Sequence, residues 1–269
     1  MPWRLTTDVA EFQTSAGAFL AGNPVENAPL LTETAYLAAV PGSREGLLLG
    51  AWTDDAGTVR GALVRAPRHN PLLTDMPREA LVQLAAELPG PPGLGVPEHL
   101  ATDAIAAWQQ AGTMLTPRQT FTVHRLGELA TRRPPTGRAR AAVASDRALL
   151  HRWFDELMAA LPGDPSDRAY VIDDPLEFGG LVLWEVDDAP VAMCGRSRTV
   201  AGTVRLGPCY APDGNAANAE AAFMAACAAA TRSARHVLVL APTAADEEAR
   251  RLARAGFVPA ATRVALAPR

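Results

Sequence analysis

The sequence predicts a protein of the α/β (α+β) class, in which a mixed, mostly antiparallel sheet is flanked by helices. One observation is the order of strand and helix patterns over 138–266, which is β-α-α-β-β-β-α-β-α-β. Another is that the first half of the chain repeats much of this order, although not the residues themselves. A segment rich in Pro, Gly and Arg separates the halves. We therefore predict an N-terminal domain at 1–126, a linker at 127–137 and a second domain at 138–269.

The composition is that of an ordinary globular protein. Of the 269 residues, 48% are hydrophobic and 20% are charged, as in soluble domains. We expect neither a membrane span nor a secretory signal, because the chain has no Pro-free apolar run of about 18 residues and no basic-then-apolar leader. Cys194, Cys209 and Cys227 are odd in number and lie in apolar segments. They predict buried thiols in a cytoplasmic protein, with no disulfide and no metal site.

Every one of the 25 basic residues is an arginine, a bias that indicates a GC-rich bacterial genome and says nothing about mechanism. Eight of them lie between Arg118 and Arg152, where only Glu128 and Asp146 are acidic. Such a cluster can meet a phosphate-rich partner. A solvated linker and helix face is the simpler explanation, and we favour it.

Turn and capping signals place the elements of the first half. Asp8 is the expected N-cap of the first helix, and Asp54-Asp55-Ala56-Gly57 is typical of a hairpin turn. The breaker segment Pro89–Gly93 separates two later helices. The patterns predict, in order, a strand at Trp3–Thr6, two helices up to about Val40, strands at Leu47–Thr53 and Thr58–Ala66, helices at Pro77–Leu88 and Pro97–Ala111, and a strand at Thr113–Leu126.

The second half has the clearer patterns. Ser145-Asp146 is the expected cap of a helix whose apolar residues share one face, and Asp187-Asp188-Ala189-Pro190 joins two strands of a meander. The predicted elements are a strand at Arg138–Val143, the capped helix, a helical stretch at Asp164–Gly179, strands at Leu181–Val186, Val191–Thr199 and Val204–Tyr210, a long helix from Ala217, a strand at Val237–Leu240, a helix at Asp246–Ala255 and a strand at Val258–Leu266.

The strand, loop and helix between Val204 and Ala229 carry the main functional signal. Gly207-Pro208 is expected to break or splay the strand, and Pro212-Asp213-Gly214-Asn215 is turn chemistry. This unit, set in the element order of 138–266, resembles the GNAT superfamily of N-acyltransferases, and the resemblance covers the whole second half. We interpret 1–126 as a second, GNAT-like half that lacks a cofactor strand and loop of its own.

The resemblance implies a place for the acyl donor. In this family the loop reads Arg/Gln-x-x-Gly-x-Gly/Ala and cradles the pyrophosphate of coenzyme A. The matching stretch is Ala216–Ala221, and only its last residue fits: Ala216 takes the Arg/Gln position and Ala219 that of the first Gly. Either Asn215 or Asn218 is expected to cap the helix. The implied donor-binding residues are Gly207, Cys209, Tyr210, Ala211, Ala216, Ala217, Asn218 and Ala219. Acetyl-CoA or another acyl donor is the cofactor that the resemblance implies, but the altered loop favours a self-capped structural helix over tight binding of coenzyme A.

A second landmark of the family lies on its fourth helix, where an Asn is followed by a Tyr that protonates the leaving thiolate. Aligning on Gly256-Phe257 puts Ala249 and Leu252 at these positions. Neither side chain donates a proton. The loss would slow acetyl transfer without forbidding it, because water can protonate a thiolate.

The remaining candidates are weaker. Glu185 lies where some relatives place a general base, and a solvated carboxylate at the sheet edge is an equal alternative. Tyr170 and Asp173 fall in the helical region that shapes acceptor pockets in this fold. Arg196 and Arg198 alternate on one strand and form a basic patch that suits a carboxylate or phosphate, or a solvated sheet face. For Cys209, an inert thiol is favoured over a nucleophile.

Three functions compete. The first is an acyltransferase that acylates the amine of a small molecule and takes its acyl or aminoacyl group from a carrier-protein thioester or an aminoacyl-tRNA, with Arg118–Arg152 meeting that donor. The net charge of −4 is unfavourable for non-specific RNA binding. The second is a GNAT-fold binding or regulatory module without catalysis, and the third is a slow acetyl-CoA-dependent enzyme. We favour the first.

Overall fold

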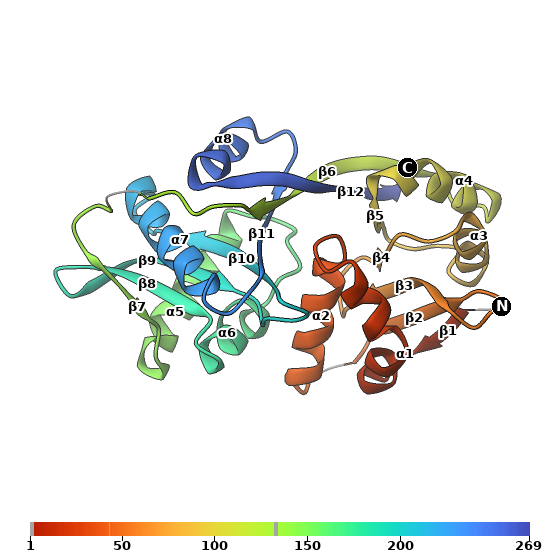
Figure 1. Ribbon diagram of the computed structural model, residues 1–269, viewed down its shortest axis with the longest axis horizontal. Helices are drawn as coiled ribbons and strands as arrows, with labels where there is room; N and C mark the ends of the chain where they lie inside the picture. The colour runs from red at the N-terminus through yellow and green to blue at the C-terminus, as the bar shows by residue number, and fades with distance from the viewer. Residues whose placement is uncertain (1–2, 43, 132–133) are drawn as a thin grey trace. The chain divides into compact units, whose positions relative to one another are not determined.

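The computed structural model of the chain describes residues 3–42, 44–131 and 134–269 (Figure 1). These residues form helices and a mixed, mostly antiparallel sheet, which confirms the predicted class. The chain folds as two compact units. Unit 1 combines Met1–His124, Leu240–Arg250 and Pro259–Arg269, and unit 2 combines Arg125–Val239 and Arg251–Val258. The last three elements thus contribute to both units, whereas the predicted domains, 1–126 and 138–269, assign them to one; those boundaries stay a prediction.

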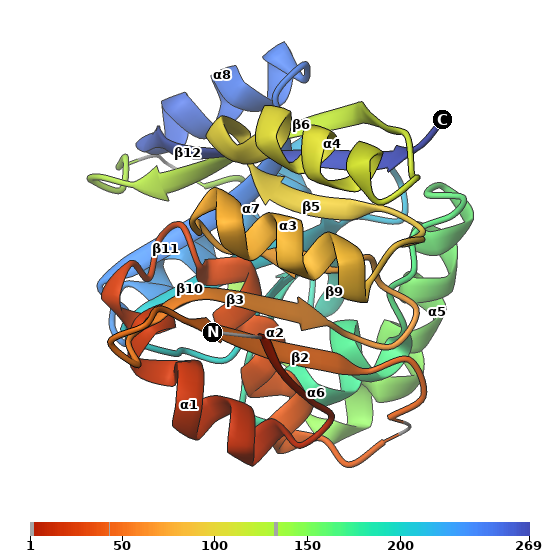
Figure 2. The ribbon, with the colours of Figure 1, turned by 90° about the vertical axis from the view of Figure 1, so that its right-hand side faces the viewer.

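Unit 1 is a sheet with helices packed on it, α3 and α4 lying together beside β5 (Figure 2). Its strand order is β1-β2-β3-β4-β5-β12-β6, and β4 pairs with β5 in parallel. The elements are β1 (Trp3–Thr6), α1 (Val9–Gly22), α2 (Ala28–Ala39), β2 (Leu48–Thr53), β3 (Val59–Arg65), β4 (Leu72–Leu73), α3 (Arg78–Glu87), β5 (Leu94–Pro97), η1 (Glu98–Leu100), α4 (Ala101–Gln110), β6 (Leu115–Leu126) and most of β12 (Phe257–Pro268). Its core contains Trp3, Trp52, Leu63, Leu84 and Trp108, all buried.

The first helix begins as predicted, because the Asp8 carboxylate accepts hydrogen bonds from the backbone N–H groups of Ala10 and Glu11. Two short strands were not predicted. β4 has two residues, and β5 lies in a Pro- and Gly-rich segment whose composition indicates a loop. Pairing of β5 with β12, in which Val96 faces Val264, explains why the predicted helix from Pro97 begins as an α-helix only at Ala101.

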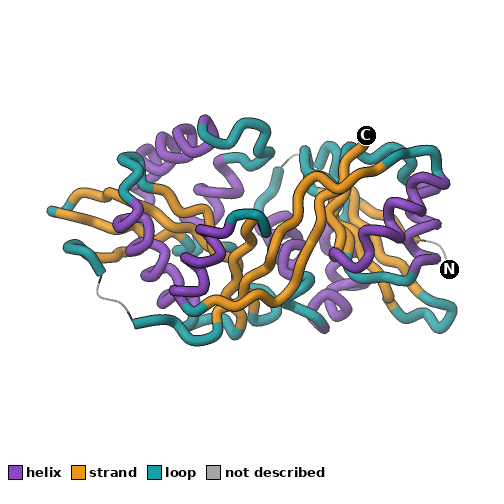
Figure 3. The backbone as a smooth tube through the Cα atoms, turned by 90° about the horizontal axis from the view of Figure 1, so that it is seen from above, coloured by secondary structure: helices purple, strands orange, loops and turns teal. Residues whose placement is uncertain are grey.

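Unit 2 has the strand order β11-β10-β9-β8-β7, antiparallel except for the parallel pair β10 and β11. In Figure 3 its helices, in purple, lie against the orange strands, and α7 contacts β8, β9 and β10. The elements are β7 (Arg138–Ala141), η2 (Ala144–Asp146), α5 (Arg147–Ala159), η3 (Ala169–Asp173, a π-helix), α6 (Asp174–Glu177), β8 (Leu181–Val186), β9 (Ala189–Arg196), β10 (Thr203–Tyr210), α7 (Ala216–Ala230), most of β11 (His236–Pro242) and part of α8 (Asp246–Ala255). One core cluster joins α5, η3 and α6 to the sheet through Trp153, Ile172, Leu183 and Met193.

Strand β10 changes its pairing halfway along. It pairs with β11 only from Thr203 to Arg205, and its register with β9 shifts between Leu206 and Cys209. Gly207, at this bulge, has a φ of 120°, a conformation that favours glycine. The predicted interruption at Gly207-Pro208 is therefore present, and the second half of β10 pairs with β9 but not with β11.

The prediction of three free thiols was wrong for two of them. Cys194 on β9 and Cys209 on β10 face each other across the strand pair, with their Cα atoms 4.0 Å apart, and form a disulfide. Their sequence separation of 15 does not reveal this, because only the register across the bulge makes them opposite. Cys227 is a buried thiol whose pKa is raised by burial to about 12. The thiol argument for a cytoplasmic location therefore no longer holds.

The predicted cap of α5 was also wrong in its detail. The Asp146 carboxylate does not cap α5; it accepts from the backbone N–H of Val143 at 2.8 Å and binds Arg140. A short 3₁₀ turn, η2, leads into the helix instead. The sequence pattern located the helix start correctly but not the partner of the carboxylate.

Candidate functional site

The turn between β10 and α7 satisfies its own hydrogen-bonding groups. The Asn215 side-chain oxygen accepts hydrogen bonds from the backbone N–H groups of Ala217 and Asn218, at 3.1 and 3.2 Å. The N–H of Ala219 bonds the Asn215 carbonyl oxygen at 3.0 Å, and the N–H of Asn215 bonds the Asp213 carboxylate at 2.9 Å. Of the two predicted caps, Asn215 is the one that caps α7.

This cap bears directly on anion binding. A helix N-terminus holds a phosphate through backbone N–H groups that have no other partner, assisted by the helix dipole. At the start of α7 the N–H groups of Asn215, Ala217 and Asn218 already have side-chain acceptors, and the Asp213 carboxylate adds negative charge beside them. The predicted donor residues Ala216, Ala217, Asn218 and Ala219 lie together on this exposed or half-exposed first turn.

The donor residues predicted on β10 lie at its bulge and beyond. Gly207 is exposed and Tyr210 is half-buried, while Ala211 is buried directly after the strand. Cys209 is bonded to Cys194 and so cannot act as a thiol nucleophile in this form. Of these residues only Tyr210 carries a hydroxyl group, and its partner lies on α5.

Tyr210 keeps its proton. Its hydroxyl donates a hydrogen bond to the Glu156 carboxylate at 3.0 Å, and its ring lies 6.4 Å from that of Trp153. Burial, together with the Glu156 carboxylate, raises the pKa of the phenol above its ordinary value. Sequence reasoning had not identified Glu156, since the two residues are 54 positions apart and only the packing of α5 on the sheet brings them together.

Glu185 is part of a closed ion cluster on β7 and β8. Its buried carboxylate binds the guanidinium groups of Arg138 and Arg140, with Nε–O distances of 3.0 and 2.5 Å. Arg140 also forms a two-pronged ion pair with Asp146. Hydrogen bonds from Arg140 and then Arg138 lower the pKa of Glu185, and a lowered pKa makes a weaker base. These contacts favour a structural role over both alternatives that the sequence left open, a general base and a solvated carboxylate.

The four predicted acceptor residues divide between separate sets of contacts. The Tyr170 hydroxyl accepts a hydrogen bond from Arg205 on β10. Asp173 instead binds His151 and Arg147 of α5, at 2.8 and 3.1 Å. Arg196 and Arg198 come together over the ring of Phe178, a residue that sequence reasoning had not singled out.

At the position of the family's general acid, α8 offers no proton donor. Leu252 is completely buried, and the neighbouring Ala249 lacks a polar group. Arg251, between them, binds Glu220 of α7 at 2.6 Å and lies 4.3 Å above the ring of Phe223. The guanidinium of Arg251 is therefore paired within unit 2.

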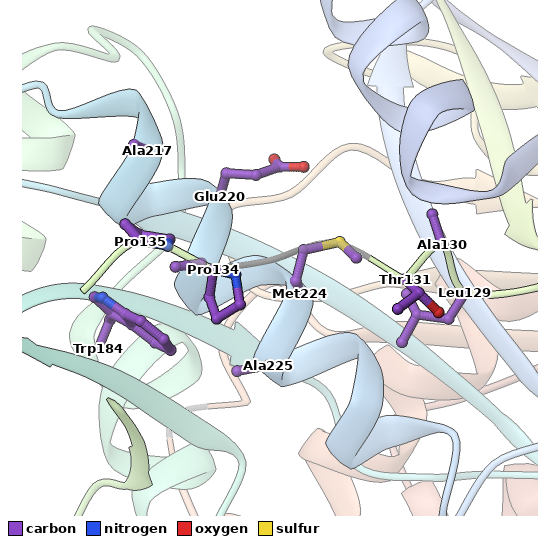
Figure 4. A pocket seen from close by; sticks show the side chains of 11 residues that line it. Leu129, Ala130, Thr131, Pro134, Pro135, Trp184, Ala217, Glu220, Met224 and Ala225 are labelled. Atoms are coloured by element: carbon purple, nitrogen blue, oxygen red, sulfur yellow. The ribbon is translucent and has the colours of Figure 1, made fainter. Parts of the chain in front are cut away.

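Unit 2 also contains a largely apolar cavity of about 510 Å³ beside α7 (Figure 4). Its size lies in the range of small-molecule pockets. The indole N–H of Trp184, which is buried, has no hydrogen-bond acceptor among the described residues. Of the predicted donor residues only Ala217 lines this cavity. The full lining is Leu129, Ala130, Thr131, Pro134, Pro135, Trp184, Ala217, Glu220, Ala221, Met224 and Ala225.

The described part of the chain has neither a metal-ligand cluster nor a membrane-spanning helix. Within 3–42, 44–131 and 134–269, no three side chains of His, Cys, Asp or Glu are grouped so that they could hold a metal ion. No helix of the same residues is both long enough and apolar enough to cross a membrane.

Solved structures resemble this chain over nearly its whole length. A GNAT-family acetyltransferase from Colwellia psychrerythraea matches 100% of this chain and 99% of its own, with a TM-score of 0.57 and 10% identity. A GCN5-related N-acetyltransferase from Sphaerobacter thermophilus matches 99% and 95%, with a TM-score of 0.57 and 15% identity. A tandem GNAT protein from the clavulanic acid biosynthesis pathway matches 99% and 98%, with a TM-score of 0.54 and 12% identity.

These likenesses establish the fold. The chain has the GNAT fold, and its match to a tandem GNAT protein over both halves agrees with the two-half architecture predicted from element order. No protein-family model matches the sequence, and no curated protein matches it in sequence.

Proposed function

We propose that this protein is an N-acyltransferase that acylates the amine of a small molecule, with unit 2 as the catalytic part. The observation that supports the proposal is the bulge of β10, after which the strand pairs with β9 and no longer with β11. In the GNAT fold this opening receives the acyl arm of the donor. The protonated hydroxyl of Tyr210 lies on the strand segment beyond the bulge.

We propose further that the donor is a thioester other than free acetyl-CoA. The Asn215 cap occupies N–H groups that would otherwise hold a pyrophosphate, and Asp213 repels one. Between the two alternative donors, we favour a thioester carried by a protein over an aminoacyl-tRNA. In the Arg118–Arg152 cluster, Arg138, Arg140 and Arg147 are already paired with carboxylates, which leaves less charge for RNA. Arg132 and Arg133 of that cluster lie outside the described residues.

The decisive experiment compares donors. The full chain is incubated with a mixture of small amines and either acetyl-CoA or an acetylated carrier protein, and the amide product is measured by mass spectrometry. We expect product from the carrier-bound thioester and at least tenfold less from acetyl-CoA. Equal or faster turnover with acetyl-CoA would make the protein an acetyl-CoA enzyme and refute the proposed donor.

A loop variant tests the reasoning behind this choice. Asn215→Ala combined with Ala216→Arg and Ala219→Gly frees the N–H groups and restores the family pattern. We expect it to gain a thermal shift with 1 mM acetyl-CoA, since a ligand at 100 times its Kd stabilises by about 2.7 kcal/mol. Asp8→Ala is the matched control, because it removes an equivalent cap, worth about 1 kcal/mol, from α1 in unit 1.

A catalytically inactive binding module is the second candidate, and two observations favour it. The family's proton donor is replaced by the buried Leu252, and Glu185 is held in an ion cluster. If no donor yields an amide while the protein still binds amines in calorimetry, this second function replaces the first.

A further inference from the structure

Two arginines of unit 2 lie over the same aromatic ring but differ in their partners. The guanidinium carbon of Arg198 is 4.8 Å from the centre of the Phe178 ring, and that of Arg196 is 5.4 Å from it. Arg198 donates two hydrogen bonds to one carboxylate oxygen of the buried Asp174, at 3.0 and 2.7 Å. The charge of Arg198 is therefore balanced inside the protein.

The charge of Arg196 is not balanced in this way. Within the described chain its guanidinium has no carboxylate or hydrogen-bonding partner, although the side chain is only partly exposed. The charged neighbour acting on it is Arg232, just after α7. Burial and then the charge of Arg232 lower the pKa of Arg196, so the site opposes its positive charge when empty.

A bound anion would reverse this balance. A guanidinium recognises carboxylates and phosphates through two parallel N–H donors, and stacking on an aromatic ring holds its plane in position. Phe178 provides such a ring for Arg196, while Asp174 fixes Arg198 over the same ring. An incoming oxyanion would gain a charge-assisted pair and relieve the repulsion between Arg196 and Arg232.

We propose that Arg196, stacked on Phe178 and assisted by Arg232, binds the carboxylate or phosphate group of a small-molecule ligand. The site lies where β9 ends, on the residue that faces Leu206 of β10. It uses no group of the turn at the start of α7, so it does not depend on the nature of the acyl donor. The proposal goes beyond acyl transfer, since the same site would serve a binding module equally well.

The test measures thermal unfolding and calorimetric binding of the full chain with two probes, inorganic phosphate and succinate, at constant ionic strength maintained with chloride. We expect a saturable rise in Tm with at least one probe, and the stronger probe identifies which anion the site prefers. No saturable response to either probe up to 20 mM would overturn the proposal.

Variants then locate the response. We expect Arg196→Gln to weaken binding at least tenfold and Arg232→Gln to weaken it less, while Arg196→Lys retains part of it because the charge remains. Arg152→Gln is the matched control, an exposed arginine of α5 in the same unit. If Arg196→Gln folds with the Tm of Arg152→Gln and binds the probe equally well, the site is elsewhere and the inference is wrong.

Discussion

Two arginine clusters of unit 2 look alike in the sequence and differ in the structure. On β7 and β8, Arg138 and Arg140 surround the buried carboxylate of Glu185, and Arg140 also binds Asp146. At the end of β9, Arg198 has a carboxylate partner whereas Arg196 has none among the described residues. The first cluster is closed and the second is open. The comparison teaches that pairing, and not the number of arginines in a segment, indicates where an anionic ligand can bind.

The largest expected effect on stability is that of the disulfide between β9 and β10, and β9 also carries the open cluster. Reduction of Cys194–Cys209 releases a closed loop of about 15 residues, which lowers the free energy of unfolding by about 3 kcal/mol. Urea unfolding with and without a phosphine reductant measures this. The double variant Cys194→Ser/Cys209→Ser should be as unstable as the reduced protein and insensitive to reductant. Equal midpoints for the oxidised and reduced wild type would contradict the prediction.

Asp174→Asn should remove the carboxylate partner of Arg198, the paired arginine of the cluster at the end of β9. It leaves Arg198 without its carboxylate and lowers the free energy of unfolding by about 1–3 kcal/mol. The same variant should bind phosphate more tightly than the wild type, because the guanidinium of Arg198, which lies over the same ring as that of Arg196, loses its carboxylate partner. Chemical unfolding and calorimetry give the two readouts. Weaker phosphate binding in a folded Asp174→Asn protein would show that Arg198 is not part of the proposed anion site.

Acid should weaken the closed cluster at β7 and β8. Arg140 holds the pKa of both Glu185 and Asp146 below their ordinary values. A carboxylate whose pKa is lowered in the folded state stabilises the protein fully when the pH is above the pKa of the unfolded state. This stabilisation is lost as the pH falls through the folded-state pKa. Unfolding followed between pH 6 and pH 3 should therefore show a loss below about pH 4.5 that is steeper in the wild type than in Glu185→Gln. Parallel curves would mean that these ion pairs add nothing to stability.

The smallest expected effect is that of Arg196→Gln on stability without ligand. Loss of the contact with Phe178 is offset by relief of the repulsion from Arg232, so the free energy of unfolding should change by less than about 0.5 kcal/mol. A loss of several kcal/mol in urea unfolding would show that Arg196 is a structural residue like Arg140 and would remove the contrast between the clusters.

Local chemistry was enough to predict much of the fold. The strand Leu181–Val186 and the helix Asp246–Ala255 have the predicted bounds, because a short apolar run and an acidic first turn are local signals. The interruption at Gly207 and the cap of α7 are also local; the sequence indicated the first and offered Asn215 as one of two residues for the second.

The site depends on contacts that no local pattern encodes. The disulfide needs the register of β9 with β10, and the partners of Glu185 come from β7, more than 40 positions earlier in the chain. Phe178 lies in a short segment after α6 and meets Arg196 and Arg198 only because β8 and β9 pair. Residue types predicted where charges would gather, but only the pairing showed which of them lack a partner.

The Asn215 side chain can also be regarded as a ligand already attached to its receptor. Its amide oxygen sits on the N–H groups of Ala217 and Asn218, and its tether is the backbone of the same turn. A tethered group competes at an effective concentration in the millimolar range or above. Any free anion that binds at the start of α7 must therefore displace the Asn215 side chain, which dilution cannot remove. Weakly binding anions are excluded in this way without a lid or a second protein.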